Sequence, residues 1–297
     1  MRILLTGTSG QVGGVLAGPL AEFGEVVAAN RAMLDLADVA SIPEKLDAIA
    51  PQVIVNPAAY TAVDRAEDEP ELAFRVNGAA PGAIASWAAA RQVPVVHFST
   101  DYVFSGSGDR PWREDDATGP LSVYGRSKLQ GEQALRAAGG PHLIVRSSWI
   151  YHRTGTNFLR TIARLAAERD ELRIVADQIG APTSAALIGA TLTDLLRKFS
   201  GDFSALATAS GGTLHLAASG TASWHDFATA IVAGLKARGR PARAARIVPI
   251  RTPEYPTKAV RPLNSRLDLA RITKLLGRPM PPWQAALETE LDHIVEK

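Results

Sequence analysis

Tyr124 and Lys128 are the two residues whose types and spacing point most directly to chemistry. They lie four positions apart in a helix predicted over residues 124–138, so their side chains share one face. A phenol has an ordinary pKa of about 10, which a neighbouring ammonium group lowers. Such a pair can deliver a proton to a carbonyl oxygen while hydride arrives at the carbon. The same spacing also arises by chance on amphipathic helices, so the pair alone leaves the activity open.

Thr100 follows a predicted strand over residues 94–99. Ligands of open α/β sheets bind beyond the carboxyl ends of the strands. A hydroxyl at that place can hydrogen-bond a substrate carbonyl and support the charge that develops on its oxygen. The alternative is a strand-end hydroxyl that only satisfies backbone groups.

Three glycines, Gly7, Gly10 and Gly13, separate the first predicted strand from the first predicted helix. Glycines at this spacing allow a tight turn and a close approach of the backbone to a pyrophosphate. The helix N-terminus then offers free N–H groups and the positive end of its dipole. A glycine turn without any ligand is the alternative, and the position at the first strand–helix junction favours the dinucleotide site.

The second predicted strand ends in Asn30 and Arg31. Sites for NAD carry an acid there for the ribose 2′-hydroxyl, whereas an Arg accepts the 2′-phosphate of NADP. The sequence therefore favours NADPH, with Asp35 available to an adenine or ribose. NADH remains a second cofactor to test, and a solvated loop charge is the alternative role for Arg31.

The elements that position these residues alternate between short apolar strands and helices. Continuous apolar strands separated by helices indicate a parallel sheet covered on both faces, here a Rossmann-type doubly wound α/β sheet. The strands are predicted over residues 2–6, 25–29, 52–55, 94–99 and 142–146, and the helices over residues 11–22, 39–49, 71–91 and 124–138.

The alternation weakens after residue 151, which predicts a smaller C-terminal substrate-binding lobe. We expect a dinucleotide-binding domain over residues 1–150 and mainly a substrate lobe over residues 151–297, with some segments returning to the first domain. Helices are predicted over residues 157–169, 184–198, 224–238 and 282–295, and strands over residues 172–175, 214–217 and 247–250.

Composition excludes several classes of protein. The 297 residues are 46% hydrophobic and 21% charged, which argues against disorder, and the net charge of +2 argues against a nucleic-acid partner. With no cysteine, the chain has no disulfide, thiolate metal site or cysteine nucleophile. No segment is predicted to enter a membrane, so we expect a cytoplasmic protein.

Together these motifs resemble the extended short-chain dehydrogenase/reductases, and within them the dTDP-4-dehydrorhamnose reductase family. The resemblance covers nearly the whole chain. The more specific runs are Thr-Asp-Tyr at 100–102, Asp-Gln-Ile-Gly-Ala-Pro-Thr at 177–183 and Arg-Pro-Leu-Asn-Ser at 261–265. The other runs are residues 7–13, 56–67, 76–77 and 120–132.

The resemblance implies roles for individual residues. Thr100, Tyr124 and Lys128 would carry the chemistry, with Asn77 in support. The cofactor would be lined by Gly7, Gly10, Gln11, Val12, Gly13, Arg31, Asp35, Leu36, Ala59, Tyr60 and Thr61. The substrate would meet Thr100, Asp101, Trp149, Asn157 and Arg261, the last two toward its phosphates. Core packing for Trp149 and a surface ion pair for Arg261 are the alternatives.

The implied reaction is the NADPH-dependent reduction of the C4 ketone of a dTDP-4-dehydro-6-deoxy sugar. One alternative is an epimerase or 4,6-dehydratase on the same scaffold. Dehydratases typically follow Thr-Asp with Glu, and here Tyr102 stands at that place. A second alternative is a non-catalytic regulatory subunit that keeps nucleotide binding, against which the intact Thr100, Tyr124 and Lys128 argue.

Two positions depart from the family pattern. Pro57 stands where a small Ala is usual. Some relatives pair through a Mg²⁺ held by glutamates, one of them on the first helix, but residues 13–16 contain no acid. We therefore expect no metal, and a homodimer formed by that route is in doubt.

Overall fold

The computed structural model describes residues 1–294 and is built on a six-stranded parallel sheet. The strand order is β10-β5-β4-β3-β1-β2, and every neighbouring pair runs parallel. The strands are β1 (Arg2–Leu5), β2 (Glu25–Ala28), β3 (Val53–Asn56), β4 (Val95–Thr100), β5 (His142–Ser147) and β10 (Thr213–His215). The prediction of a doubly wound α/β fold is confirmed.

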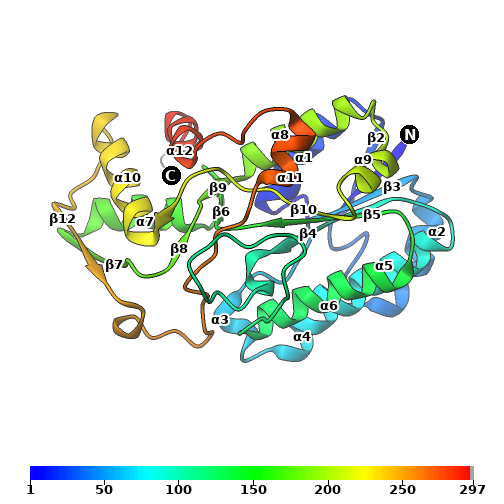
Figure 1. The fold of residues 1–297 in the computed structure, drawn as a ribbon, viewed down its shortest axis with the longest axis horizontal. Coiled ribbons are helices and arrows are strands. Elements are labelled where there is room, and N and C mark those ends of the chain that lie inside the picture. The colour runs from blue at the N-terminus through cyan, green and yellow to red at the C-terminus, as the bar shows by residue number, and fades with distance from the viewer. Residues whose placement is uncertain (295–297) are drawn as a thin grey trace.

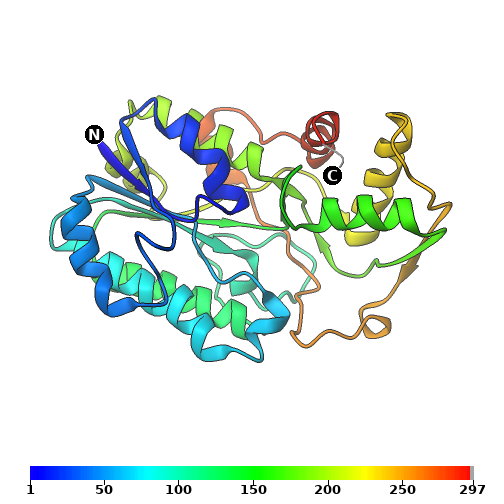
Figure 2. The same ribbon diagram turned by 180° about the vertical axis from the view of Figure 1, so that it is seen from behind.

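Two helical layers cover the sheet because alternate residues of each strand face opposite sides. Ile3 and Leu5 pack into one apolar cluster, while Leu4 between them packs into the other. Figures 1 and 2 show the two layers above and below the sheet. One contains α1 (Gln11–Leu20), α8 (Ala185–Lys198) and α11 (Ala270–Leu276), and the other contains α2 (Ile42–Ile49), α5 (Ala80–Ala89) and α6 (Val123–Ala138).

The C-terminal half of the chain returns to this sheet. Strand β10 pairs with β5, α8 packs against α1, and α9 (Phe203–Ala209) contributes to the cluster around Ile3. The residues that build the sheet and its layers are therefore not confined to residues 1–150.

A third apolar cluster lies beside the sheet, at the left of Figure 1. It is formed mainly by α7 (Phe158–Glu168), α10 (Trp224–Ala237) and α12 (Trp283–Asp292). A parallel pair, β7 (Glu171–Val175) with β12 (Arg246–Ile250), flanks these helices. The short strands β6 (Ile150–Tyr151), β8 (Ile179–Gly180), β9 (Thr183–Ser184) and β11 (Ala222–Ser223) link this cluster to the sheet.

The helix predicted over residues 71–91 is interrupted. Helix α4 (Pro70–Phe74) runs into a π-helical stretch (Arg75–Ala79) before α5 begins. The apolar spacing is continuous through these residues, so the pattern could not reveal the wider turn, which is a feature often found near functional sites. The helix predicted over residues 39–49 likewise opens with a 3₁₀ turn (Val39–Ser41) ahead of α2.

At the C-terminus, the helix predicted over residues 282–295 is observed as α12, and residue 295 lies outside the described part of the chain. The helices α3 (Val63–Ala66), α9 and α11 were not predicted from the sequence. Across residues 1–294, every helix is too short or too polar to cross a lipid bilayer.

Candidate active site

A cleft of about 1420 Å³ opens at the carboxyl ends of the sheet strands and extends toward the third cluster. It brings together residues that are widely separated in the sequence. The predicted site residues that line it are Gly7, Gly10, Gln11, Val12, Gly13, Arg31, Asp35, Leu36, Ala59, Thr61, Thr100, Asp101, Tyr124, Lys128, Trp149, Asn157 and Arg261.

The glycine turn brings backbone segments so close together that side chains do not fit at two of its positions. Gly7 has φ of +59°, and a Cβ on it would lie 2.9 Å from Cα of Ala58. A Cβ on Gly13 would lie 2.1 Å from the carbonyl oxygen of Gly7. The turn is closed by the N–H of Gly10, which donates to that same oxygen over 2.9 Å. The first and third glycines are therefore required by the backbone itself.

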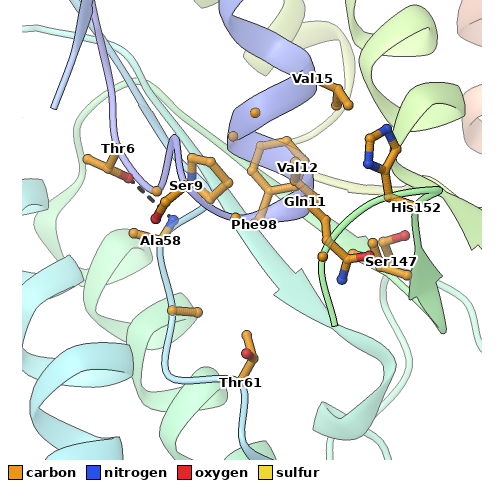
Figure 3. Close-up of a pocket in the computed structure, with 18 of the residues that line it drawn as sticks. Thr6, Ser9, Gln11, Val12, Val15, Ala58, Thr61, Phe98, Ser147 and His152 are labelled. Atoms are coloured by element: carbon orange, nitrogen blue, oxygen red, sulfur yellow. Dashed lines mark hydrogen bonds between the residues drawn. The ribbon is translucent and has the colours of Figure 1, made fainter. Parts of the chain in front are cut away.

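The residues around this turn fit an anionic dinucleotide. Gly10 is the N-cap of α1 and supplies no side-chain cap, so N–H groups at the helix start face the cleft with the positive end of the dipole. Gln11 points toward Ser147 in Figure 3. Among the described residues, the Oε1 of Gln11 and the Oγ of Ser147 are buried without a hydrogen-bond partner. Such unsatisfied atoms are expected where a polar ligand binds.

Arg31 and Asp35 lie at the rim beyond the end of β2. The Nε of Arg31 is 3.4 Å from an Oδ of Asp35, and the Arg31 side chain is 75% exposed. Asp35 also accepts a hydrogen bond from the N–H of Ala37 over 2.9 Å. An exposed ion pair of this kind is weak, so the guanidinium is free to turn toward a phosphate.

Tyr60 differs from its neighbours Ala59 and Thr61, because its side chain does not line the cleft. Its hydroxyl donates to Glu69 over 2.7 Å. Its backbone is clamped by Asn77, which accepts from the N–H of Tyr60 over 2.8 Å and donates to its carbonyl over 3.0 Å. Asn77, in the π-helical stretch, therefore shapes the loop beside the cofactor region.

Tyr124 lies in the first turn of α6, and its side chain is partly buried at the cleft. Burial raises the pKa of Tyr124 above its ordinary value, a hydrogen bond with Thr100 opposes this, and the nearby Asp101 raises the pKa further. Burial thus outweighs any neighbouring cation here, in contrast to the expectation that Lys128 lowers this pKa. A proton held firmly on the phenol suits a group that must donate it.

Lys128 lies one helical turn further along, with a side chain buried at 2% exposure. Burial lowers the pKa of Lys128 to about 8, and the carboxylate of Glu132 opposes this shift. Glu132 is itself buried and bound to Arg146, with atoms 2.6 Å apart. The ammonium group is therefore sustained by a negative charge one further turn along α6.

Asp101 joins the strand end to the C-terminal part of the chain. Its carboxylate accepts from the hydroxyl of Thr100 over 2.9 Å. Burial raises the pKa of Asp101 to about 6, while hydrogen bonds with Ser265 and Thr100 oppose the shift. The specific runs at 100–102 and 261–265 thus meet in space.

Arg261 contacts the same run from another direction. It donates to the hydroxyl of Tyr102 over 3.3 Å and forms an ion pair with Asp64 at the start of α3. The segment that contains Arg261 is therefore held against helix α3 (Val63–Ala66). Contact with a substrate phosphate stays a prediction for this residue.

Trp149 adopts an uncommon backbone conformation with φ of +48°. Its ring stacks on Trp224 with centroids 3.6 Å apart and planes inclined by 8°. Gly180 lies beneath the ring, where a Cβ would be 2.6 Å from Cε2 of Trp149. A strained backbone held by packing on both sides is typical of a functional position.

Asn157 caps α7 with its amide. Its Oδ1 accepts from the N–H of Arg160 over 3.1 Å, and its Nδ2 donates to the carbonyls of His152 and Thr154. The amide therefore shapes the loop that lines the cleft, and its predicted contact with a substrate phosphate is untested.

The sequence did not single out several residues that line the cleft. Trp224, His152 and Arg153 are examples. Trp224 stands at the start of α10 with no motif around it, so only its packing against Trp149 shows its place. In the described residues 1–294, no three acidic or histidine side chains gather in a way that could hold a metal ion.

The sheet order, the glycine turn and the Tyr124–Lys128 pair define the class of Rossmann-type proteins related to the short-chain dehydrogenase/reductases. The family model "RmlD substrate binding domain" matches residues 1–296. The chain belongs to this family. It is similar to dTDP-4-dehydrorhamnose reductase from Escherichia coli K12, with 41% identity over 99% of this chain and 98% of the relative. The enzyme of the same name from Burkholderia thailandensis is 43% identical, with 97% of each chain covered.

Solved structures show the same relationship. A dTDP-4-dehydrorhamnose reductase from Clostridium acetobutylicum superposes with a TM-score of 0.87 at 32% identity, covering 98% of this chain and 99% of that one. The enzyme of that name from Bacillus anthracis, solved in complex with NADP, gives a TM-score of 0.86 at 31% identity, with 99% of each chain covered.

Proposed function

We propose that this chain is an NADPH-dependent reductase of dTDP-4-dehydro-6-deoxy-L-mannose, which it converts to dTDP-L-rhamnose. Relatives with about two fifths of their residues identical over nearly full length carry the name of this activity. A structural relative named for the same activity holds NADP. The residues of the cleft are chemically suited to that reaction.

The observation that carries the proposal is one cleft that joins the uncapped start of α1 to Tyr124 and Thr100. When bound, the reduced dinucleotide supplies the hydride for the sugar carbon. Tyr124 donates its proton to the sugar oxygen, since burial keeps that proton on the phenol until charge develops nearby. The hydroxyl of Thr100, whose proton turns from Asp101 to the sugar oxygen, orients the ketone and shares the developing charge.

The surroundings of Asp101 favour reduction over elimination. The next residue, Tyr102, is a phenol whose pKa is raised by burial and lowered by Arg261, so it provides no second carboxyl group. A 4,6-dehydratase would need an acid at that place. The neutral hydroxyl instead holds Arg261 at the mouth of the cleft.

The third cluster suits a substrate lobe formed mainly by residues 151–297, with α8, α9, β10 and α11 returning to the dinucleotide-binding part. Trp149, Asp101 and Arg261 would then meet the dTDP-sugar where the two parts face each other. Contacts made by the remote nucleotide would position the ketone for reaction. A homodimer is the remaining partner expectation, to be measured by light scattering.

The experiment is an assay of purified protein with the 4-keto sugar nucleotide and with NADPH or NADH. We expect stoichiometric oxidation of NADPH and a product with L-rhamnose stereochemistry by NMR. Cofactor binding without turnover would replace this proposal with the regulatory role. Tight retention of NAD with no consumption of added NADPH would favour an epimerase.

A further inference from the structure

A buried chain of polar groups crosses the sheet behind the cleft and ends on Lys128. The Nζ of Lys128 lies 3.3 Å from Nε2 of His97, whose Nδ1 lies 3.2 Å from Nδ2 of Asn56. The Oδ1 of Asn56 accepts from the hydroxyl of Thr6 over 2.6 Å. That hydroxyl accepts in turn from the N–H of Ala58 over 3.3 Å, a contact drawn in Figure 3. This series of hydrogen-bonded side chains thus connects the loop at Ala58 with Lys128.

The strands of the sheet position the polar side chains of this series. Thr6 follows β1, Asn56 ends β3 and His97 lies on β4, where Asn56 and His97 are paired across the two strands. All four side chains are buried, with exposures of 3% for Thr6, 1% for Asn56, 0% for His97 and 2% for Lys128. Buried polar groups without water depend on one another, because breaking one contact leaves an unsatisfied group.

His97 has a defined hydrogen-bonding state. Burial and the nearby Lys128 hold the pKa of His97 well below its ordinary value, so the ring stays neutral. A neutral imidazole donates from one nitrogen and accepts at the other. As the Asn56 amide is placed, its Nδ2 donates to Nδ1 of His97, so the ring proton lies on Nε2 and points at Nζ of Lys128 as an amine. When Lys128 is an ammonium, Nε2 must accept, the ring proton lies on Nδ1, and the Asn56 amide must turn so that its Oδ1 accepts from Nδ1.

The charged groups around Lys128 do not fix the position of its Nζ. Glu132 raises the pKa of Lys128, but Arg146 and Arg136 bind its carboxylate at 2.6 and 2.9 Å. Tyr124 lies one turn earlier on the same helix. Within residues 1–294, His97 is the only side chain that hydrogen-bonds Lys128. The carboxylate of Glu132 stabilises the charged form of Lys128, and the imidazole of His97 fixes the position of Nζ.

We propose that His97 is a positioning residue for the reaction, which holds Nζ of Lys128 through its Nε2 while Asn56 and Thr6 hold the ring. This inference rests on the proposed reductase function. The lysine acts on the phenol and on the bound dinucleotide only where its Nζ is directed into the cleft. His97 touches neither, so it works through Lys128 alone.

The test compares His97→Gln with His97→Asn in the full chain. A glutamine amide reaches the place of Nε2, whereas an asparagine amide reaches only that of Nδ1. We expect His97→Gln to keep kcat within about threefold and His97→Asn to lower it by about tenfold or more, with little change in the KM of the sugar nucleotide. The alkaline limb of the pH profile should move about one unit toward lower pH in His97→Asn, because an ammonium without its acceptor loses its proton more readily.

His215 provides a matched control. It is a second fully buried histidine of the same sheet, and burial lowers its pKa to about 3. Its ring packs edge-on against Phe104, and within residues 1–294 its ring nitrogens hydrogen-bond no other side chain. We expect His215→Asn to lower the melting temperature without moving the alkaline limb. Equal losses in both His97 variants with an unmoved pH profile would overturn the proposal and reduce His97 to a packing residue.

A measurement without turnover separates this inference from the proposed function. In protein labelled with ¹⁵N-histidine, the Nε2 shift of His97 should change in Lys128→Met, while the shifts of His215 stay fixed. An unchanged His97 signal would overturn the contact. If the sugar nucleotide is not reduced but the His97 shift responds, the reductase assignment fails and the positioning contact stands.

Discussion

The two ends of the cleft are built in different ways. The dinucleotide end is formed largely by backbone in one short stretch, where Gly7 and Gly13 leave no space for side chains. The sugar end is formed by side chains from distant segments, such as Asp101 with Ser265 and Trp149 with Trp224. The first end is rigid because local sterics fix it, and the second depends on the packing of the third cluster against the sheet.

This difference predicts separable effects of substitution. A change at the glycine turn should act on dinucleotide binding and stability, because it disturbs the backbone of a strand–helix junction. A change at the sugar end should act on turnover or on the KM of the sugar nucleotide. Tyr124 stands where the two ends meet.

The largest effect is expected for Tyr124→Phe, which removes the proton donor and keeps the ring. We expect kcat to fall by about 10²–10⁴-fold, the contribution of a positioned acid. NADPH affinity, measured by fluorescence titration, should stay within about threefold. Turnover near that of the wild type would remove Tyr124 from the chemistry.

The next effect is expected for Gly13→Ala at the dinucleotide end. A Cβ there would lie 2.1 Å from the carbonyl oxygen of Gly7, so the turn must open. We expect a loss of about 1–3 kcal/mol in the free energy of unfolding and weaker NADPH binding. Gly18→Ala is the control on the same helix, because its Cβ would meet nothing within 4 Å. That change should alter the free energy of unfolding by less than about 1 kcal/mol, because the gain in helix propensity is opposed by Pro19, which disfavours helical backbone in a preceding residue with a Cβ. Equal behaviour of the two variants would contradict the account.

At the sugar end, Asp101 makes stability depend on pH. Burial raises the pKa of Asp101 from 3.8 to about 6, so the folded protein keeps a proton that the unfolded chain has released. The contribution of Asp101 to the free energy of unfolding therefore declines by about 3 kcal/mol at most between about pH 4 and about pH 6. Above about pH 6 it is constant. In Asp101→Asn the decline should be absent from urea titrations across that range. A parallel decline in the variant would show that other groups cause it.

The smallest effect is expected for Arg31→Ala at the rim. Its guanidinium is exposed and pairs only loosely with Asp35. We expect NADPH affinity to fall by about three- to tenfold while NADH affinity is unchanged, since only NADPH carries the 2′-phosphate. An unchanged ratio of the two affinities would show that Arg31 takes no part in cofactor choice.

The same contrast explains what the sequence predicts. Gly7, Gly10 and Gly13, and the pair Tyr124 and Lys128, belong to single structural units, so their spacing alone places them correctly on the fold. The sheet was predictable because its strands are apolar runs separated by helices. The sequence predicted that some later segments return to the first domain, but it did not show that β10 is one of them, because pairing between distant strands leaves no local pattern.

Residues that act through tertiary contacts could not be identified from the sequence. Trp224 and His97 carry no motif, and their places follow only from Trp149 and Lys128 beside them. Tyr60 shows the reverse case, since its neighbours line the cleft while its side chain turns to Glu69. A residue's position in a motif therefore predicts its neighbourhood better than the direction of its side chain.

The central claim is that one cleft brings a reduced nicotinamide and the sugar ketone together beside Tyr124. The most direct test follows deuterium from NADPH that is labelled on the transferring face of nicotinamide C4. We predict that NMR of the product finds the deuterium on sugar C4 and that Tyr124→Phe slows this transfer by about 10²–10⁴-fold. Product with solvent hydrogen at C4, or label retained on the dinucleotide while the sugar is consumed, would contradict the account.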